Sequence, residues 1–238
     1  MPFIVQDFVP KLKAHILSRI KEMLSQDTST MGSGSSWPPA GLAAEQGSEA
    51  GSSSLFFKSD RLYQHNLARF NYTTYNVRRS QDVVNPKTPH RYIMLLATDG
   101  NDGAAHPFLY ARVLGIFHAN VIYTGEGSLG YTARRVEFLW VRWLERDVSR
   151  SYGWADMKLD LLRFPPMASE GVFGFVDPRD VLRGCHVVPA FKAGKARWLD
   201  GIGLSRLAQD ALDWALYSAN RYVPVLRTPS KRSQTAWI

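Results

Sequence analysis

Cysteine is almost missing from this sequence of 238 residues, which contains only Cys185. A single thiol forms no internal disulfide and cannot supply a zinc site built from several cysteines. Apolar runs of the roughly 18 residues that span a membrane are also missing. The N-terminus lacks the apolar block of a secretory signal. We therefore expect a soluble protein of a reducing, intracellular compartment.

Residue patterns typical of metal or nucleophile chemistry are equally scarce. Cys185 and His186 are neighbours on a predicted strand, so their side chains point to opposite faces and cannot hold one metal. Cys185 lies in the apolar stretch CHVVPAF and is expected to be an inert core thiol. The histidines show no ligand spacing; they are His15, His65, His90, His106, His118 and His186.

The carboxylates and glycines give no better candidate for catalysis. Asp177 and Asp180 straddle Pro178, which predicts an N-cap followed by the first residue of a short helix. Residues 125–130 form a literal G-x-G-x-x-G, but a strand is predicted after it, whereas a dinucleotide site needs a helix there. We predict a noncatalytic protein without a metal or a small-molecule cofactor.

Positive charge, by contrast, is in excess. Lys and Arg number 29 against 21 Asp and Glu, which gives a formal net charge of +8 and an isoelectric point near 9.7. Such a balance favours an acidic partner such as nucleic acid or a chromatin setting. The apolar share of 45% and the aromatic share of 12% are sufficient for a packed core, which excludes a wholly disordered chain.

The N-terminal segments differ sharply in composition. Residues 1–24 contain an amphipathic helix over residues 9–24, with apolar residues at helical spacing and lysines and arginine on the other side. This helix is marginal alone, so it must dock on the domain, on a partner or on protein not present here. Residues 25–59 are rich in Gly, Ser, Ala and Pro, which predicts a flexible, disordered linker.

Residues 60–191 show the period of two that strands have, over residues 62–77, 92–97, 109–123, 135–144, 172–176 and 185–188. Gly115 is expected to mark a bend or bulge in the third of these. The fourth is apolar on both faces, with Phe138 and Trp140 on one and Val141 and Trp143 on the other, and is therefore buried on both. These features predict a mainly β fold with flanking helices, as a small barrel or a curled sheet.

The C-terminal segments are predicted to be helix and tail. Residues 192–223 contain a stripe of Leu and Ala that indicates a helix over residues 204–222, ended by Pro224. Residues 224–238 are polar and basic and are expected to be disordered.

Several stretches resemble a group of basidiomycete proteins carried by CACTA-like, Plavaka-type DNA transposons. They include FVPKLKAHILSRI (residues 8–20), NYTTYNVRRSQDVVNPKT (71–88), HPFLYARVLGIFHANVIYTG (106–125), RRVEFLWVRWLE (134–145) and FGFVDPRDVLRGCHVVPAF (173–191). The resemblance covers most of the chain outside the linker. It implies the C-terminal portion of a longer protein whose transposase-like part lies upstream, so the chain is expected to be a transposon remnant or a truncated product.

A second resemblance concerns the order of three strands. YARVLGIF (residues 110–117), VEFLWVRWLER (136–146) and VLRGCHVVP (181–189) are similar in order to bromo-adjacent homology (BAH) domains, which are β-barrels of chromatin proteins. Some BAH domains hold a methylated lysine in an aromatic cage. The resemblance implies a cage role for Trp143, with Phe173 or Phe175 as further members; Trp140 and Tyr123 are additional aromatic candidates. Core packing is the alternative for the tryptophans.

The combined prediction is a noncatalytic, nuclear module that binds chromatin, DNA or a transposase-related protein. Arginines interleaved with Tyr72, Tyr75, Tyr131 and Trp143 suit phosphate contact plus stacking, although a solvated basic face would look the same. The basic candidates are Arg78, Arg79, Arg134, Arg135 and Arg142. The alternative function is a fragment of a transposase or nuclease with metal-dependent DNA cleavage, which would require carboxylates converging on a divalent ion.

Overall fold

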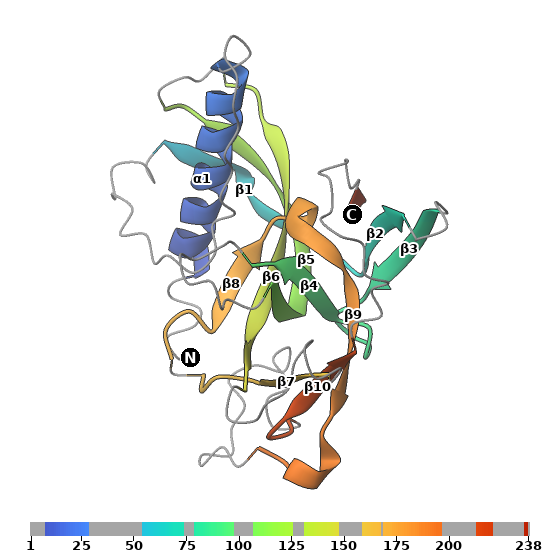
Figure 1. Ribbon diagram of the computed structural model, residues 1–238. Coiled ribbons are helices and arrows are strands. Elements are labelled where there is room, and N and C mark those ends of the chain that lie inside the picture. The colour runs from blue at the N-terminus through green and yellow to red at the C-terminus, as the bar shows by residue number, and fades with distance from the viewer. Residues whose placement is uncertain are drawn as a thin grey trace.

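The computed structural model describes residues 8–28, 54–73, 79–97, 107–125, 131–147, 159–167, 169–196, 213–220 and 236–237 (Figure 1). Over these residues the fold is mainly β, with a large antiparallel sheet and one α-helix, so the predicted fold class is confirmed. No helix in this part of the chain has the length and apolar character needed to cross a bilayer.

The large sheet curls back on itself. Its strand order is β1-β5-β4-β9-β10-β7-β6-β8, and β5 also pairs with β6. Six strands, β5, β4, β9, β10, β7 and β6, therefore form a closed ring of pairings, and β1 and β8 lie outside it. The ring is a curled sheet rather than a clean barrel. The strands are β1 (Leu55–His65), β4 (Tyr92–Leu96), β5 (Phe108–Tyr123), β6 (Arg134–Arg146), β7 (Asp160–Arg163), β8 (Phe173–Val176), β9 (Val181–Pro189) and β10 (Tyr217–Asn220).

The β5–β6 hairpin has the longest ladder of the large sheet. Its ladder runs from Tyr110 opposite Leu144 to Val121 opposite Arg134, with a register shift between Val113 and Gly115. The predicted irregularity at Gly115 is thus confirmed. A Cβ at this position would lie 2.3 Å from the ring of Phe117, so only glycine leaves room for that ring.

Three apolar clusters fill the structure. The inner core lies inside the ring and draws on all six of its strands: Tyr92, Met94, Tyr110, Leu144, Leu162, Phe164, Val187, Tyr217 and Ala219. The hairpin core, on the outside of the ring, includes Ile93, Ala111, Val113, Leu139 and Val141. The helix core, at the far end of the β5–β6 hairpin, includes Ala119, Val121, Val136 and Phe138. The expected two-sided burial of β6 is confirmed, because its even and odd positions enter different clusters.

The single α-helix, α1 (Phe8–Thr28), covers the helix core. Leu12 and Ile16 on its apolar stripe are fully buried. Arg19 fixes the helix by donating to the carbonyl of Glu137 at 2.7 Å and by pairing with Asp177 at 2.5 Å. Among the three predicted docking options, the structure shows the helix on the domain itself.

A second, three-stranded sheet covers the hairpin core. It runs β11 (Ala236–Trp237), β2 (Ala68–Thr73) and β3 (Arg79–Val84), and it buries Ala68, Phe70 and Val84 in the hairpin core. Asp82 ties it to β9 by accepting from the Gly184 amide at 3.0 Å and from Arg183 at 3.2 Å. Figure 1 shows β2 and β3 beside β9.

Four predicted boundaries are wrong. The linker is shorter than 25–59, because α1 runs to Thr28 and β1 begins at Leu55; residues 29–53 lie outside the described residues. The strand predicted over residues 62–77 is the end of β1 followed by β2. The helix predicted over residues 204–222 is contradicted by β10, and residues 204–212 are not described. Ala236–Trp237 pair with β2, so the tail is not wholly irregular.

The error at β10 has a physical reason. Alanine at positions 215 and 219 completes a helical stripe in the sequence, but β7 and β9 need a strand between them to close the ring. In the strand, Tyr217 and Ala219 both point into the inner core, as the period of two requires. Tertiary pairing outweighs the weak local preference of these residues for helix.

Candidate functional site

The aromatic candidates for a cage lie on two faces of the sheet. Trp140 pairs with Phe175, and Phe173 lies on the same face. Phe8 of α1 packs edge-on against Trp140 and Phe175, with ring centroids 5.5 and 5.0 Å apart. Trp143 is on the opposite face, where a Cβ at Gly174 would lie 2.6 Å from its indole nitrogen, and it packs on the hairpin core.

The structure therefore does not gather these aromatic side chains into one open cage. The ring face of Phe175 that a ligand would need is covered by α1, with the His15 ring also 6.0 Å away. Tyr123 packs on the helix core instead. Core packing, the alternative stated for the tryptophans, describes the contacts that these residues make.

The basic candidates are divided between surface and interior. Arg134 and Arg135, at the start of β6, are exposed. Arg142 is fully buried, so its assignment to an exposed basic strip is wrong. Arg78 and the side chain of Arg79 lie outside the described residues. The reason for the error is the alternation of β6, which turns Arg142 toward the inside of the ring.

One exposed surface brings together residues that the sequence does not connect. Tyr63 on β1, His118 on β5 and Glu137 on β6 are directly opposite one another in the ladders, and Arg135 and His65 flank them. We call these five residues the outer histidine face; it lies on the side of β5 and β6 that faces away from α1. His65 Nε2 and His118 Nδ1 are 2.6 Å apart, a hydrogen-bonding distance.

The rings of this face form a stack. Tyr63 and His118 are nearly parallel, with centroids 4.6 Å apart and 6° between planes. Arg135 pairs with Glu137 at 2.9 Å while its side chain stays 46% exposed. Partial burial, followed by the charge of Arg135, lowers the pKa of both His65 and His118. Flat rings beside an exposed guanidinium can stack on planar groups and attract anions.

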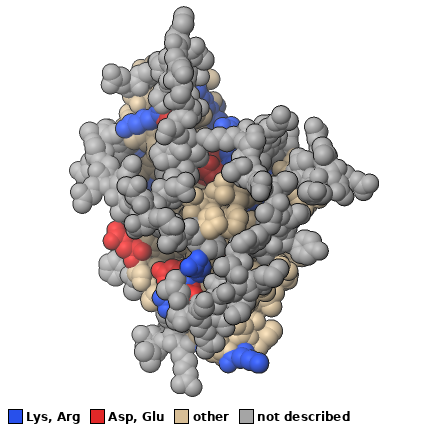
Figure 2. Space-filling view, in the orientation of Figure 1, with Lys and Arg blue, Asp and Glu red and all other residues tan. Residues whose placement is uncertain are grey.

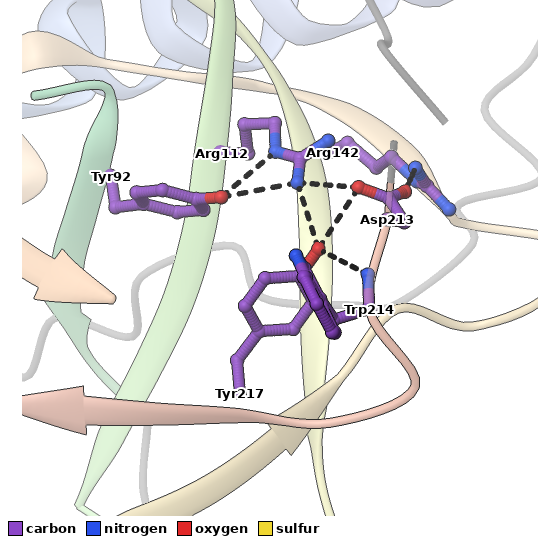
Figure 3. Close-up of polar contacts among 6 residues, drawn as sticks. All are labelled: Tyr92, Arg112, Arg142, Asp213, Trp214 and Tyr217. Atoms are coloured by element: carbon purple, nitrogen blue, oxygen red, sulfur yellow. Dashed lines mark hydrogen bonds and ion pairs between the residues drawn. The ribbon is translucent and has the colours of Figure 1, made fainter. Parts of the chain in front are cut away.

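A second polar site lies buried in the ring. Asp213 accepts from Arg112 and from Arg142, each at 2.6 Å, and from the hydroxyl of Tyr217 at 3.1 Å (Figure 3). Arg112 also donates to the hydroxyl of Tyr92 at 3.1 Å. We call these residues the arginine cluster: Tyr92, Arg112, Arg142, Asp213 and Tyr217. One carboxylate thus bridges two guanidinium groups at the centre of the molecule.

The surroundings of the arginine cluster keep its charges in place. Both guanidinium carbons lie close to the ring of Phe164, at 4.1 Å for Arg112 and 4.2 Å for Arg142. Burial acts to lower the pKa of Arg112, but Tyr92 and Asp213 outweigh that effect and raise it. A further buried carboxylate, Asp160, accepts a hydrogen bond from Tyr110 at 2.6 Å. Arg112 therefore keeps its positive charge inside the ring.

A pocket of about 280 Å³ opens beside the arginine cluster. It is lined by Lys87, Thr88, Pro89, Arg91, Tyr92, Arg112, Val187, Pro189, Asp213, Trp214 and Tyr217. A larger pocket of about 410 Å³ lies between β3, β4 and β9 and includes Asp82, His90, Cys185 and His186 in its lining. Burial raises the pKa of the Cys185 thiol to about 12, so it stays protonated and unreactive at neutral pH.

The carboxylates singled out in the sequence have structural roles here. Asp177 caps the 3-10 helix η2 (Pro178–Asp180) by accepting from the Arg179 amide at 2.9 Å, which confirms the predicted cap. Asp180 is the last residue of η2, and its amide donates to the carbonyl of Asp177 at 2.9 Å. Within the ranges that the structure describes, no three His, Cys, Asp or Glu side chains are placed to share a metal ion.

Two partly buried titratable groups, one in α1 and one in η2, predict an unusual pH dependence. Burial, then Arg19, lowers the pKa of His15 from 6.5 to about 3. Burial, then Asp177, raises the pKa of Asp180 from 3.8 to about 6. Between pH 6.5 and 3 only the unfolded chain protonates His15, which destabilises the fold as pH falls. Between pH 6 and 3.8 only the folded chain protonates Asp180, which stabilises it as pH falls.

These opposite slopes, each about 1.4 kcal/mol per pH unit, should nearly cancel between pH 4 and 6 in the unmodified chain. The His15→Phe variant should therefore gain stability as the pH falls from 6 to 4. Asp180→Asn should lose stability over the same window. Urea unfolding at four pH values would measure both slopes, and parallel profiles for all three proteins would show that neither group titrates differently on folding.

Compared with protein-family models, curated proteins and solved structures, the chain matches none of them.

Proposed function

We propose that this chain is a noncatalytic module that binds DNA, in the setting of chromatin, through the outer histidine face. The observation that carries the proposal is the Tyr63–His118 stack beside the exposed Arg135 on an open sheet surface. The resemblance to BAH modules and to transposon-associated proteins supports a nuclear binding role of transposon origin. The net charge of +8 supports an acidic partner.

The chemistry of the face suits nucleic acid in two ways. Arg135 offers an exposed guanidinium group to phosphate oxygens. Tyr63 offers a ring, 40% exposed, on which an unpaired base can stack. On the side shown in Figure 2, the described Lys and Arg residues form separate small groups with Asp and Glu between them.

A salt titration tests the proposal. We expect the affinity for a fluorescein-labelled 20-nucleotide strand, measured by anisotropy, to fall steeply with salt. The Arg135→Gln variant should flatten the slope of log K against log salt by about 0.7, as expected for one lost phosphate contact. Lys192→Gln is the matched control, because Lys192 is equally exposed but lies on the 3-10 helix η3 (Phe191–Ala193).

Two results would contradict the proposal. One is an affinity that does not change with salt, because phosphate binding releases counterions. The other is an equal loss of slope in Arg135→Gln and Lys192→Gln, which would show a diffuse attraction without a site. Tyr63→Ala separates stacking from charge: it should weaken binding of the single strand by about 1–3 kcal/mol and leave the salt slope unchanged.

A further inference from the structure

The pocket beside the arginine cluster has a composition that two opposite ligands could use. Its lining includes the rings of Tyr92, Trp214 and Tyr217 together with the carboxylate of Asp213. Three rings and a carboxylate are the components of a site for an alkylated ammonium ion. Lysine and arginine side chains in the same lining favour an anion instead. The positions of the charges decide between the two.

The cation position of this pocket is already occupied by the protein. The guanidinium of Arg112 bonds Asp213 at 2.6 Å and lies 5.5 Å from the centre of the Tyr92 ring. Asp213 also forms an ion pair with Arg142 at 2.6 Å. An incoming ammonium ion would therefore meet a carboxylate that two arginines share. Repulsion from Arg112 at close range would exceed a cation–π contact with a partly exposed ring.

The other charged residues of the lining also favour an anion over a cation. Lys87 and Arg91 stand with Arg112 around the pocket, so three cations face the single carboxylate of Asp213. Burial, and then the charge of Arg112, lowers the pKa of Arg91, as expected where positive potential is in excess. An anion between Lys87 and Arg91 would reduce this excess.

The volume and the apolar residues of the pocket indicate which kind of molecule bears the anionic group. A volume of about 280 Å³ is small for a ligand pocket and suits one acidic side chain better than a nucleic-acid backbone. Pro89, Val187 and Pro189 form the apolar part of the lining. Phe191 packs edge-on against Trp214 at 4.9 Å and remains 66% exposed. An exposed aromatic residue beside a charged pocket is typical of a surface that binds a peptide.

We propose that this pocket receives a carboxylate from an acidic peptide segment of a protein partner, and that Phe191 packs against an apolar residue next to it. Lys87 and Arg91 pair with the carboxylate, and Arg112 supplies the positive field behind them. This site is separate from the outer histidine face, which is built on β1, β5 and β6. Its failure would leave the proposed DNA binding intact.

The test uses the full chain and a fluorescein-labelled peptide, Glu-Glu-Leu-Glu-Glu, at constant ionic strength. We expect Lys87→Gln and Arg91→Gln each to weaken binding about five-fold, as for the loss of one partly exposed ion pair. Lys11→Gln should leave the affinity unchanged, because Lys11 is exposed on α1 and lies outside the pocket lining. Lys87 is itself exposed, so its substitution should not disturb the fold.

Competition experiments complete the design. Acetate should displace the labelled peptide, whereas phosphate should be no better a competitor at equal ionic strength. The proposal is overturned if the peptide does not bind at millimolar concentration, or if Lys11→Gln weakens it as much as Lys87→Gln. It is also overturned if a trimethyllysine peptide binds better, or if phosphate alone displaces the probe.

Discussion

Replacement of Asp213 by alanine should destabilise the molecule by about 3–5 kcal/mol, because it leaves two buried arginines without their shared carboxylate. Arg112 and Arg142 have almost no exposed surface, so water cannot take over the role of Asp213. Tyr217 also loses the acceptor of its hydroxyl, which lies 3.1 Å away. Since domains are stable by only about 5–15 kcal/mol, this single change should remove a large part of the free energy of unfolding.

Urea unfolding followed by tryptophan fluorescence would measure this loss. Glu137→Ala is the matched control, because it also removes the acidic partner of an arginine, but on the surface, where such pairs contribute about 0–1 kcal/mol. A loss below about 1 kcal/mol for Asp213→Ala would contradict the structure of the arginine cluster. The triple variant Arg112→Met, Arg142→Met and Asp213→Leu should recover stability, because it removes all three charges of the arginine cluster at once.

The strands of the β5–β6 hairpin were accessible to prediction because their signals are local. Alternation of apolar residues predicts both strands, and Gly115 interrupts the first of them at the observed register shift. The cap at Asp177 is local too, since the acceptor and the donor are two residues apart. Such features need no knowledge of how distant segments meet.

The polar sites depend on register and on distant partners, and local patterns carry little information about either. His65 and His118 are 53 positions apart, and only the β1–β5 ladder places them together. Asp213 lies 101 positions from Arg112, in a segment that the sequence predicts to be helical. Single-sequence patterns could not pair them.

One signal for the arginine cluster is nevertheless present in the sequence. Arg112 and Arg142 each interrupt an otherwise apolar strand, in YARVLGIF and FLWVRWL. A charge in the middle of a strand that is buried on both faces must have a buried counter-ion, because unpaired buried charge is strongly unfavourable. Reading Arg142 as a surface residue overlooked this requirement. The same reasoning, applied first, predicts a buried carboxylate without identifying it as Asp213.

Substitution of Leu12 by alanine should give the second large effect, a loss of about 2–5 kcal/mol of stability. Leu12 has no exposed surface and packs in the helix core with Phe138 and Val121. Truncation would remove apolar contacts and leave a cavity under α1, because the rigid β5–β6 hairpin cannot close around it.

The neighbouring Lys11 provides the control for this prediction, since it is exposed on the same turn of α1. Lys11→Ala should change the free energy of unfolding by less than about 0.5 kcal/mol. Trp140 reports on helix docking, because Phe8 covers its ring in the folded state. In Leu12→Ala the tryptophan emission, to which Trp140 contributes, should shift to longer wavelength at lower urea than in the unmodified chain. Equal midpoints for Leu12→Ala and Lys11→Ala would show that α1 does not stabilise the sheet by docking on it.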